Sequence, residues 1–142
     1  MDYQAAAPAG YAAIDRLNAY VEDCGLDYRL LKLVTLRASQ INGCAYCLEM
    51  HGKAARRLGE QEERLDMLAA WRESPAFSAR ERAALAWTEA LTLVADSHVP
   101  DDVFAEAQRH FGAKELVDLT WAVVVINGWN RVAIGFHAVP GT

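Results

Sequence analysis

The chain has 142 residues, a net charge of −5 and a hydrophobic fraction of 53%, which is typical of one folded domain and not of a disordered chain. Its basic residues are interleaved with acids, so a basic face for nucleic acid is not expected. The first ten residues lack the features of a signal peptide, and the longest apolar run is too short to cross a bilayer. We therefore expect a single domain over residues 1–142, with no membrane association and a cytoplasmic location.

The spacing of apolar residues is helical along almost the whole chain. Gly25 is placed to end a first helix, Asp27 to cap a second, and Gly43 to end that second helix. Further on, Ser78 and Glu81 form a capping box. The sequence predicts an all-α fold, a single-domain bundle of about six or seven helices. These helices are expected over residues 11–23, 28–41, 44–58, 62–71, 78–95, 100–111 and 114–137.

The last of these helices is apolar around much of its girth and also carries Trp121 and Trp129. A helix of this kind is either central to a core or shared with another subunit. Because the chain is small, we favour a contact between subunits for residues 114–137.

Three cysteines are too few, and odd in number, for a secreted disulfide scaffold. Cys24, at a helix end, is expected to be a small buried hydrophobic residue. Cys44 and Cys47 form a Cys-x-x-Cys motif, and His51 follows four residues later. On an α-helix all three share one face, with the cysteines in the first turn, where free N–H groups and the helix dipole stabilise a thiolate. This pattern indicates a nucleophile at Cys47, a base at His51 and a disulfide partner at Cys44.

Other interpretations of the motif are open. A structural zinc site needs about four ligands, and the remaining histidines, at positions 98, 110 and 137, have no paired spacing. A structural disulfide across so short a loop would add little stability. A thioredoxin-like site needs βαβ units around the motif, whereas helices flank it here. His51 could also be a buried core histidine. We favour a redox dithiol with no metal and no bound cofactor.

The segment LRASQINGCAYC at residues 36–47, followed by His51, resembles the core of the AhpD-like alkylhydroperoxidases of the carboxymuconolactone decarboxylase superfamily. The segments ERAALA at 81–86 and INGWNR at 126–131 resemble other recurrent segments of that superfamily. The resemblance implies an all-helical domain, with a core of about residues 28–138, that assembles into homotrimers or homohexamers. It also implies antioxidant reduction of hydroperoxides by the dithiol, without haem, flavin or metal. Electrons would come from an external dithiol protein, lipoyl or thioredoxin-like.

Carried over to this chain, the resemblance makes Cys47 the peroxide-attacking thiol, Cys44 the resolving thiol and His51 part of a proton relay. Two positions depart from the pattern and are possible modulators. The glutamate often found twelve residues before the first cysteine is Lys32 here, and a histidine before the second cysteine is Tyr46. Lys32 accepts a proton only if its pKa is strongly lowered, although its charge can favour a thiolate. The alternative interpretation of Lys32 is a solvated charge on the protein surface. Tyr46 can donate a hydrogen bond but is a poor base.

The expected function is therefore that of a thiol-dependent hydroperoxide reductase. A first alternative is a redox-sensing or disulfide-exchange oligomer, in which disulfide formation changes the binding of a partner. A second is a lactone enzyme of the decarboxylase branch, which does not depend on a Cys-x-x-Cys motif. The sequence does not specify the peroxide, the donor protein or the number of subunits.

Overall fold

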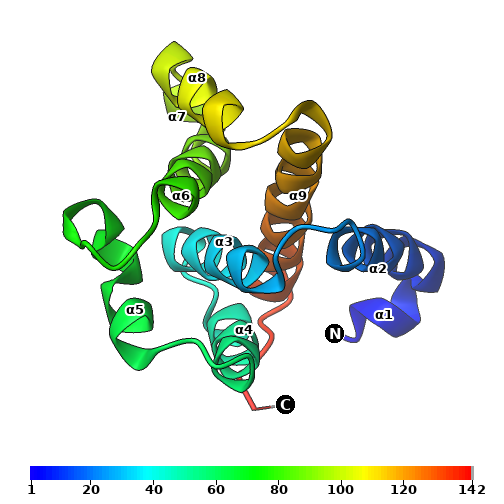
Figure 1. The fold of residues 1–142 in the computed structure, drawn as a ribbon. Helices are drawn as coiled ribbons and strands as arrows, with labels where there is room; N and C mark the ends of the chain where they lie inside the picture. The colour runs from blue at the N-terminus through cyan, green and yellow to red at the C-terminus, as the bar shows by residue number, and fades with distance from the viewer. Residues whose placement is uncertain (142) are drawn as a thin grey trace.

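The computed structural model describes residues 1–141, and every regular element in that range is a helix (Figure 1). The all-α prediction is confirmed. The α-helices are α1 (Tyr3–Ala6), α2 (Pro8–Glu22), α3 (Tyr28–Asn42), α4 (Ala45–Arg57), α5 (Glu62–Met67), α6 (Ala79–Thr92), α7 (Val94–Ser97), α8 (Asp101–His110) and α9 (Ala113–Gly135), and a 3₁₀-helix, η1 (Leu68–Glu73), follows α5. The expected six or seven helices correspond to the longer ones, since α1 and α7 are single turns of four residues.

The local signals in the sequence act where they were expected. An oxygen of Asp27 accepts the backbone N–H of Arg29 at 2.8 Å and caps α3, and Ser78 and Glu81 form the capping box of α6. Several boundaries differ from the prediction, and the helix expected over 62–71 is divided into α5 and η1. Helix α2 begins at Pro8, a residue that suits the first position of a helix, and α6 ends at Thr92, where the chain turns into α7.

Helix α3 lies at the centre of the bundle, between α4, α6 and α9 (Figure 1). Its Leu30 and Val34 are buried with Leu119 and Val123 of α9. On another side of the helix, its leucines pack against α6, η1 and Ala55 of α4. A helix enclosed on several sides must be apolar on several sides. The two ends of α3 are therefore fixed in place by the core.

Helix α9 contacts α2, α3, α4, α6 and α8 and is thus central to the core. It also exposes four large apolar side chains, Val117, Trp121, Val124 and Ile134. The sequence left both roles open; the core role is confirmed, and the contact with another subunit stays a prediction. No helix within residues 1–141, α9 included, is long and apolar enough to cross a membrane.

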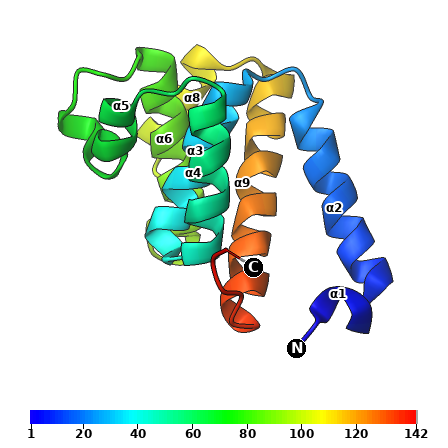
Figure 2. The same ribbon diagram turned by 90° about the horizontal axis from the view of Figure 1, so that it is seen from below.

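Helix α2 packs mainly against α9, and α1 packs against α2 at the chain start (Figure 2). Helix α2 is tied to α9 by the Tyr20 hydroxyl, which donates to a carboxylate oxygen of Asp118 at 2.6 Å. Near the other end of α2, the Tyr11 ring meets the edge of Trp129, with centroids 5.4 Å apart. The chain start thereby forms one wall of the space beside the cysteines.

Candidate active site

The turn between α3 and α4 places the two cysteines. Gly43 ends α3 in the left-handed region, at φ 70°, a conformation that glycine adopts without strain. The next backbone N–H, that of Cys44, then donates to the carbonyl of Ser39 at 3.0 Å. The Cys44 sulfur accepts the N–H of Cys47 at 3.3 Å, so Cys44 is the N-cap of α4. The prediction that both cysteines lie inside the first turn is thus wrong for Cys44, which precedes the helix, and right for Cys47.

Cys44 and Cys47 form a disulfide, with their Cα atoms 5.3 Å apart. Each residue is only 1% exposed, and both pack against Ala133 of α9. The sulfurs lie at the amino end of α4, where the helix dipole favours negative charge. When the pair is reduced, the thiol that ionises there is stabilised as a thiolate.

A cavity of about 300 Å³ lies among α1, α2, α3, α4 and α9 and reaches Cys47 but not Cys44. The ring-bearing side chains in its wall, other than His51, come from four different helices, and they are Tyr3, Tyr11, Tyr46 and Trp129. A small molecule in this cavity meets Cys47 directly. Cys44 does not line the cavity, so such a molecule can affect Cys44 only after it has reacted with Cys47.

Lys32 points into the same cavity and is 7% exposed, so it is not a solvated surface charge. Its Nζ lies 3.4 Å from Nδ1 of His51. Burial lowers the pKa of Lys32, and the negative charge of Glu22 opposes that shift. Burial, together with the nearby lysine, lowers the pKa of His51 to about 4. His51 is therefore neutral near pH 7. Because it lines the cavity beside Cys47, it is not an enclosed core histidine.

Tyr46 is half-buried, lines the cavity and packs with the cysteine pair. Sequence reasoning missed the contributions of Tyr3, Tyr11 and Glu22, which reach the cavity from α1 and α2. No motif marks these residues, because only the packing of α2 on α9 brings them there. Trp129 carried a signal, since it lies in the segment 126–131 that resembles a recurrent family segment.

The same segment fastens the cysteine turn to α9. Nδ2 of Asn42 donates to Oδ1 of Asn127 at 3.0 Å and to Oδ1 of Asn130 at 2.9 Å. Asn130, which is fully buried, donates in turn to Ser39 Oγ at 3.1 Å. Each buried amide is satisfied by a partner that also fixes the turn. The asparagines therefore act on the site by holding its backbone.

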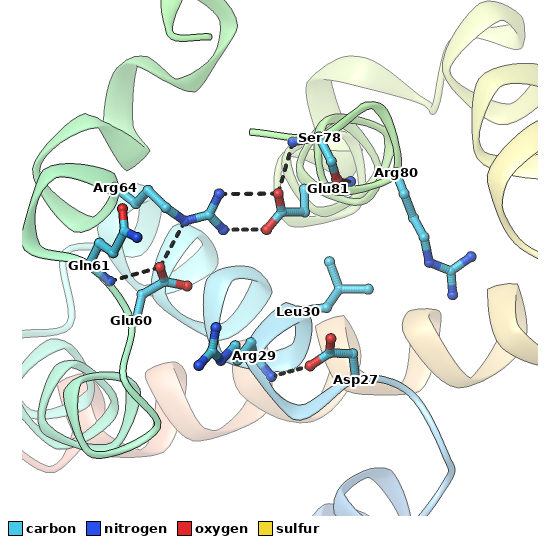
Figure 3. Close-up of a pocket in the computed structure, with 9 residues that line it drawn as sticks. All are labelled: Asp27, Arg29, Leu30, Glu60, Gln61, Arg64, Ser78, Arg80 and Glu81. Atoms are coloured by element: carbon cyan, nitrogen blue, oxygen red, sulfur yellow. Dashed lines mark hydrogen bonds and ion pairs between the residues drawn. The ribbon is translucent and has the colours of Figure 1, made fainter. Parts of the chain in front are cut away.

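A second cavity, of about 420 Å³, lies at the opposite end of α3, between α5 and the start of α6 (Figure 3). Three arginines and three acids line it, and Arg64 pairs there with both Glu60 and Glu81. Arg80 pairs with Glu115 outside the cavity, and Arg29 donates to a backbone carbonyl. Since α3 has 15 residues, this cavity lies about 20 Å from the cysteines. Its charges are engaged with the chain itself.

The other residues considered as ligands are dispersed. Cys24 is half-buried against the main core, less enclosed than expected. His110 meets Glu106 on α8, while His98 and His137 are exposed on other segments. Within residues 1–141, no group of three or more His, Cys, Asp or Glu side chains is arranged to hold a metal ion.

An all-helical bundle with a Cys-x-x-Cys pair at a helix start, beside a histidine and a cavity, defines a class of proteins. The chain belongs to the carboxymuconolactone decarboxylase family, whose model matches residues 7–90. It is 35% identical to the uncharacterized protein YdfG of Bacillus subtilis (strain 168) over 134 residues, covering 94% of this chain and 91% of YdfG. It is also 35% identical to the uncharacterized protein YnjA of Escherichia coli (strain K12) over 96 residues, 67% of this chain and 52% of YnjA.

Among solved structures, the chain is similar to ATU0492 of Agrobacterium tumefaciens, a protein of unknown function provisionally named as an antioxidant defence protein AhpD. The TM-score is 0.96 at 41% identity, covering 100% of this chain and 97% of ATU0492. The debrominase Bmp8 shares the fold at a TM-score of 0.83 and 18% identity, over 92% of this chain and 70% of Bmp8. The resemblance to AhpD-like proteins is thus confirmed, and the fold with its cysteine pair supports a function of the antioxidant type.

Proposed function

We propose that the protein is a thiol-dependent hydroperoxide reductase in which Cys47 attacks the peroxide and Cys44 resolves the product. One observation carries this proposal. Cys47 lines a cavity large enough for an organic hydroperoxide, while its disulfide partner Cys44 does not. The order of the two sulfurs follows from that access, because the first thiol must meet the substrate and the second needs only to meet the first.

The reaction balances with the groups at this site. The Cys47 thiolate attacks the terminal oxygen of ROOH; an S–O bond forms, the O–O bond breaks, and RO⁻ leaves and takes up a proton. The Cys44 thiol then displaces water from the Cys47 sulfenic acid and closes the disulfide. Two thiols are oxidised to one disulfide, and ROOH is reduced to ROH and water. His51, one helical turn from Cys47, is placed to move the proton.

An external dithiol protein, lipoyl or thioredoxin-like, completes the cycle by thiol–disulfide exchange. No bound cofactor enters the proposed reaction. The exposed apolar side chains of α9 support assembly into a homotrimer or homohexamer, since exposed patches of this kind often mark subunit contacts. A cytoplasmic location fits a dithiol that must be reduced in every cycle.

The test is the consumption of cumene hydroperoxide by protein reduced with dihydrolipoamide. Cys47→Ser should lower the rate at least ~100-fold, because no other thiol lines the cavity. The matched control is Cys24→Ser, which removes a half-buried thiol outside the cavity and should leave the rate unchanged. Equal rates for wild type and Cys47→Ser would refute the proposal.

A redox-responsive oligomer is the second candidate. The disulfide packs against Ala133, and the next residue, Ile134, is exposed on α9. Opening the disulfide would thus act next to an apolar surface. Light scattering of the reduced and the oxidised protein tests this second function. A redox-responsive oligomer requires that the number of subunits changes on oxidation and that peroxide turnover is slow. The intact cysteine pair gives no support to a lactone decarboxylase.

A further inference from the structure

Lys32 is a buried base whose partners are few. Its Nζ contacts Nδ1 of His51 at 3.4 Å and lies 4.8 Å from the centroid of the Tyr28 ring. It makes no ion pair within the described residues, 1–141. The negative charge of Glu22 on α2 acts on this amine, and that carboxylate accepts the Tyr28 hydroxyl at 3.3 Å. A buried amine without an ion pair binds its proton less tightly than a solvated one.

The groups around this amine come from each helix packed on it. Helix α2 supplies Glu22 and, further along the cavity that reaches Cys47, Asp15. Helix α3 supplies Tyr28, and α4 supplies His51 and Cys47. A separate small cavity, of about 20 Å³, also adjoins Lys32, and the side chains that α9 contributes to it are apolar. The amine therefore has one imidazole neighbour through which it can reach the dithiol.

The histidine by itself is a poor store for the proton of Cys47. Its pKa is lowered to about 4 by burial and by Lys32, so an imidazolium is disfavoured near neutral pH. A neutral imidazole can still conduct a proton, because it accepts on one ring nitrogen while it gives from the other. With Nδ1 facing Lys32, Nε2 is the nitrogen left for Cys47 or for a water in the cavity.

Resting on the proposed function, we propose that the Lys32 ammonium group is the proton source for the leaving alkoxide, and that the His51 ring conducts its proton there. In the first step, Cys47 S–H gives its proton to solvent, and the thiolate forms near the Lys32 cation. In the second, the thiolate attacks ROOH, Nε2–H protonates RO⁻, and Lys32 gives a proton to Nδ1; the neutral amine that results regains its proton from solvent. Protons and charge balance, since solvent takes up one proton and returns one, and His51 is neutral at the end of each step. Lys32 acts through His51 and is a positioning residue.

The first experiment measures the pH dependence of Cys47 alkylation by iodoacetamide in the reduced protein, which needs no peroxide. In Lys32→Met the thiolate loses a nearby cation, so the midpoint of alkylation should rise by at least about one pH unit. The matched control is Lys53→Met, the same change at an exposed lysine on α4 that pairs with Glu49, and its midpoint should equal that of wild type. Thermal unfolding checks that both variants are folded.

The second experiment separates proton transfer from charge. Lys32→Arg keeps a cation that does not release its proton. Its rate with cumene hydroperoxide, divided by the thiolate fraction that alkylation reports, should fall at least about 10-fold. A wild-type alkylation profile in Lys32→Met, or a wild-type rate per thiolate in Lys32→Arg, would overturn the inference. If the wild type itself does not react with the hydroperoxide while the Lys32→Met midpoint still moves, the proposed function fails and the coupling of lysine to thiol stands.

Discussion

The two cavities that adjoin α3 carry opposite arrangements of charge. At the amino end, Arg64 is held by Glu60 and Glu81, and the cavity beside it is lined by groups engaged with the chain itself (Figure 3). In the cavity that reaches Cys47, Lys32 and His51 contact each other, and neither makes an ion pair within residues 1–141. Both cavities adjoin the same helix, α3.

The difference shows what marks the reactive site in this molecule. Saturated ion pairs join elements and stay in one protonation state. A buried amine without an ion pair, beside an imidazole whose pKa is lowered, is instead poised to exchange protons. The groups in the 420 Å³ cavity therefore hold elements of the fold together, whereas those in the 300 Å³ cavity beside Cys47 are suited to proton transfer. A variant in one cavity therefore has the other cavity as its reference.

The largest effect is expected from His51→Ala in the cavity that reaches Cys47. Loss of a positioned proton carrier should slow the reaction of reduced protein with hydroperoxide about 100-fold at pH 7, with little change in stability. Stopped-flow Trp fluorescence measures the rate, since Trp129 lines the cavity. His110→Ala, which removes a ring paired on α8, should react like wild type. An unchanged rate in His51→Ala would remove the histidine from the mechanism.

Asn130→Ala removes one of the links between the cysteine turn and α9. Ser39 and Asn42 each lose one hydrogen-bond partner, and that of Ser39 is fully buried, so the free energy of unfolding should fall by about 2–3 kcal/mol. Urea unfolding measures it. Because the turn is loosened, closure of the disulfide after peroxide treatment should also be slower. A loss of stability with unchanged closure would confine Asn130 to the core.

Arg64→Met acts at the amino end. It strips two half-buried carboxylates of their partner and should cost about 1–2 kcal/mol in urea unfolding. Unlike the changes near the cysteines, it should leave the alkylation rate of Cys47 as in wild type. A matched surface change, Lys53→Met, should cost less than ~0.5 kcal/mol. Altered thiol reactivity in Arg64→Met would show that the two cavities are coupled.

The smallest effect concerns pH. The pKa of His51 is about 4 in the folded chain and 6.5 as the reference, so the unfolded chain binds a proton first as the pH falls. Stability due to the neutral ring is fully present above pH 6.5; about 1 kcal/mol of it is lost between about pH 6.5 and about pH 5.5, and the loss continues as the pH falls toward 4. His51→Gln should flatten this part of the stability curve relative to wild type, whereas His137→Gln, an exposed histidine, should not. Parallel curves for wild type and His51→Gln would contradict the buried imidazole.

The elements that sequence reasoning placed well are those with local causes. Gly43 and the capping box of Ser78 and Glu81 act within a few residues, so helix ends and the dithiol motif could be predicted. Long-range packing decided the rest. Lys32 is buried because α2 and α4 close over that face of α3, and Glu22 reaches the cavity from a helix with no motif. Cys44 is the N-cap of α4 because, after the left-handed turn at Gly43, the helix begins at Ala45, one residue later than predicted.

The central claim is that Cys47, and not Cys44, is oxidised first. It is tested most directly by treating reduced Cys44→Ser and Cys47→Ser proteins with one equivalent of cumene hydroperoxide in the presence of dimedone, then locating the sulfenic acid adduct by mass spectrometry. The account predicts an adduct on Cys47 in Cys44→Ser and almost none on Cys44 in Cys47→Ser. Comparable adducts on both sulfurs, or an adduct on Cys44 alone, would contradict it.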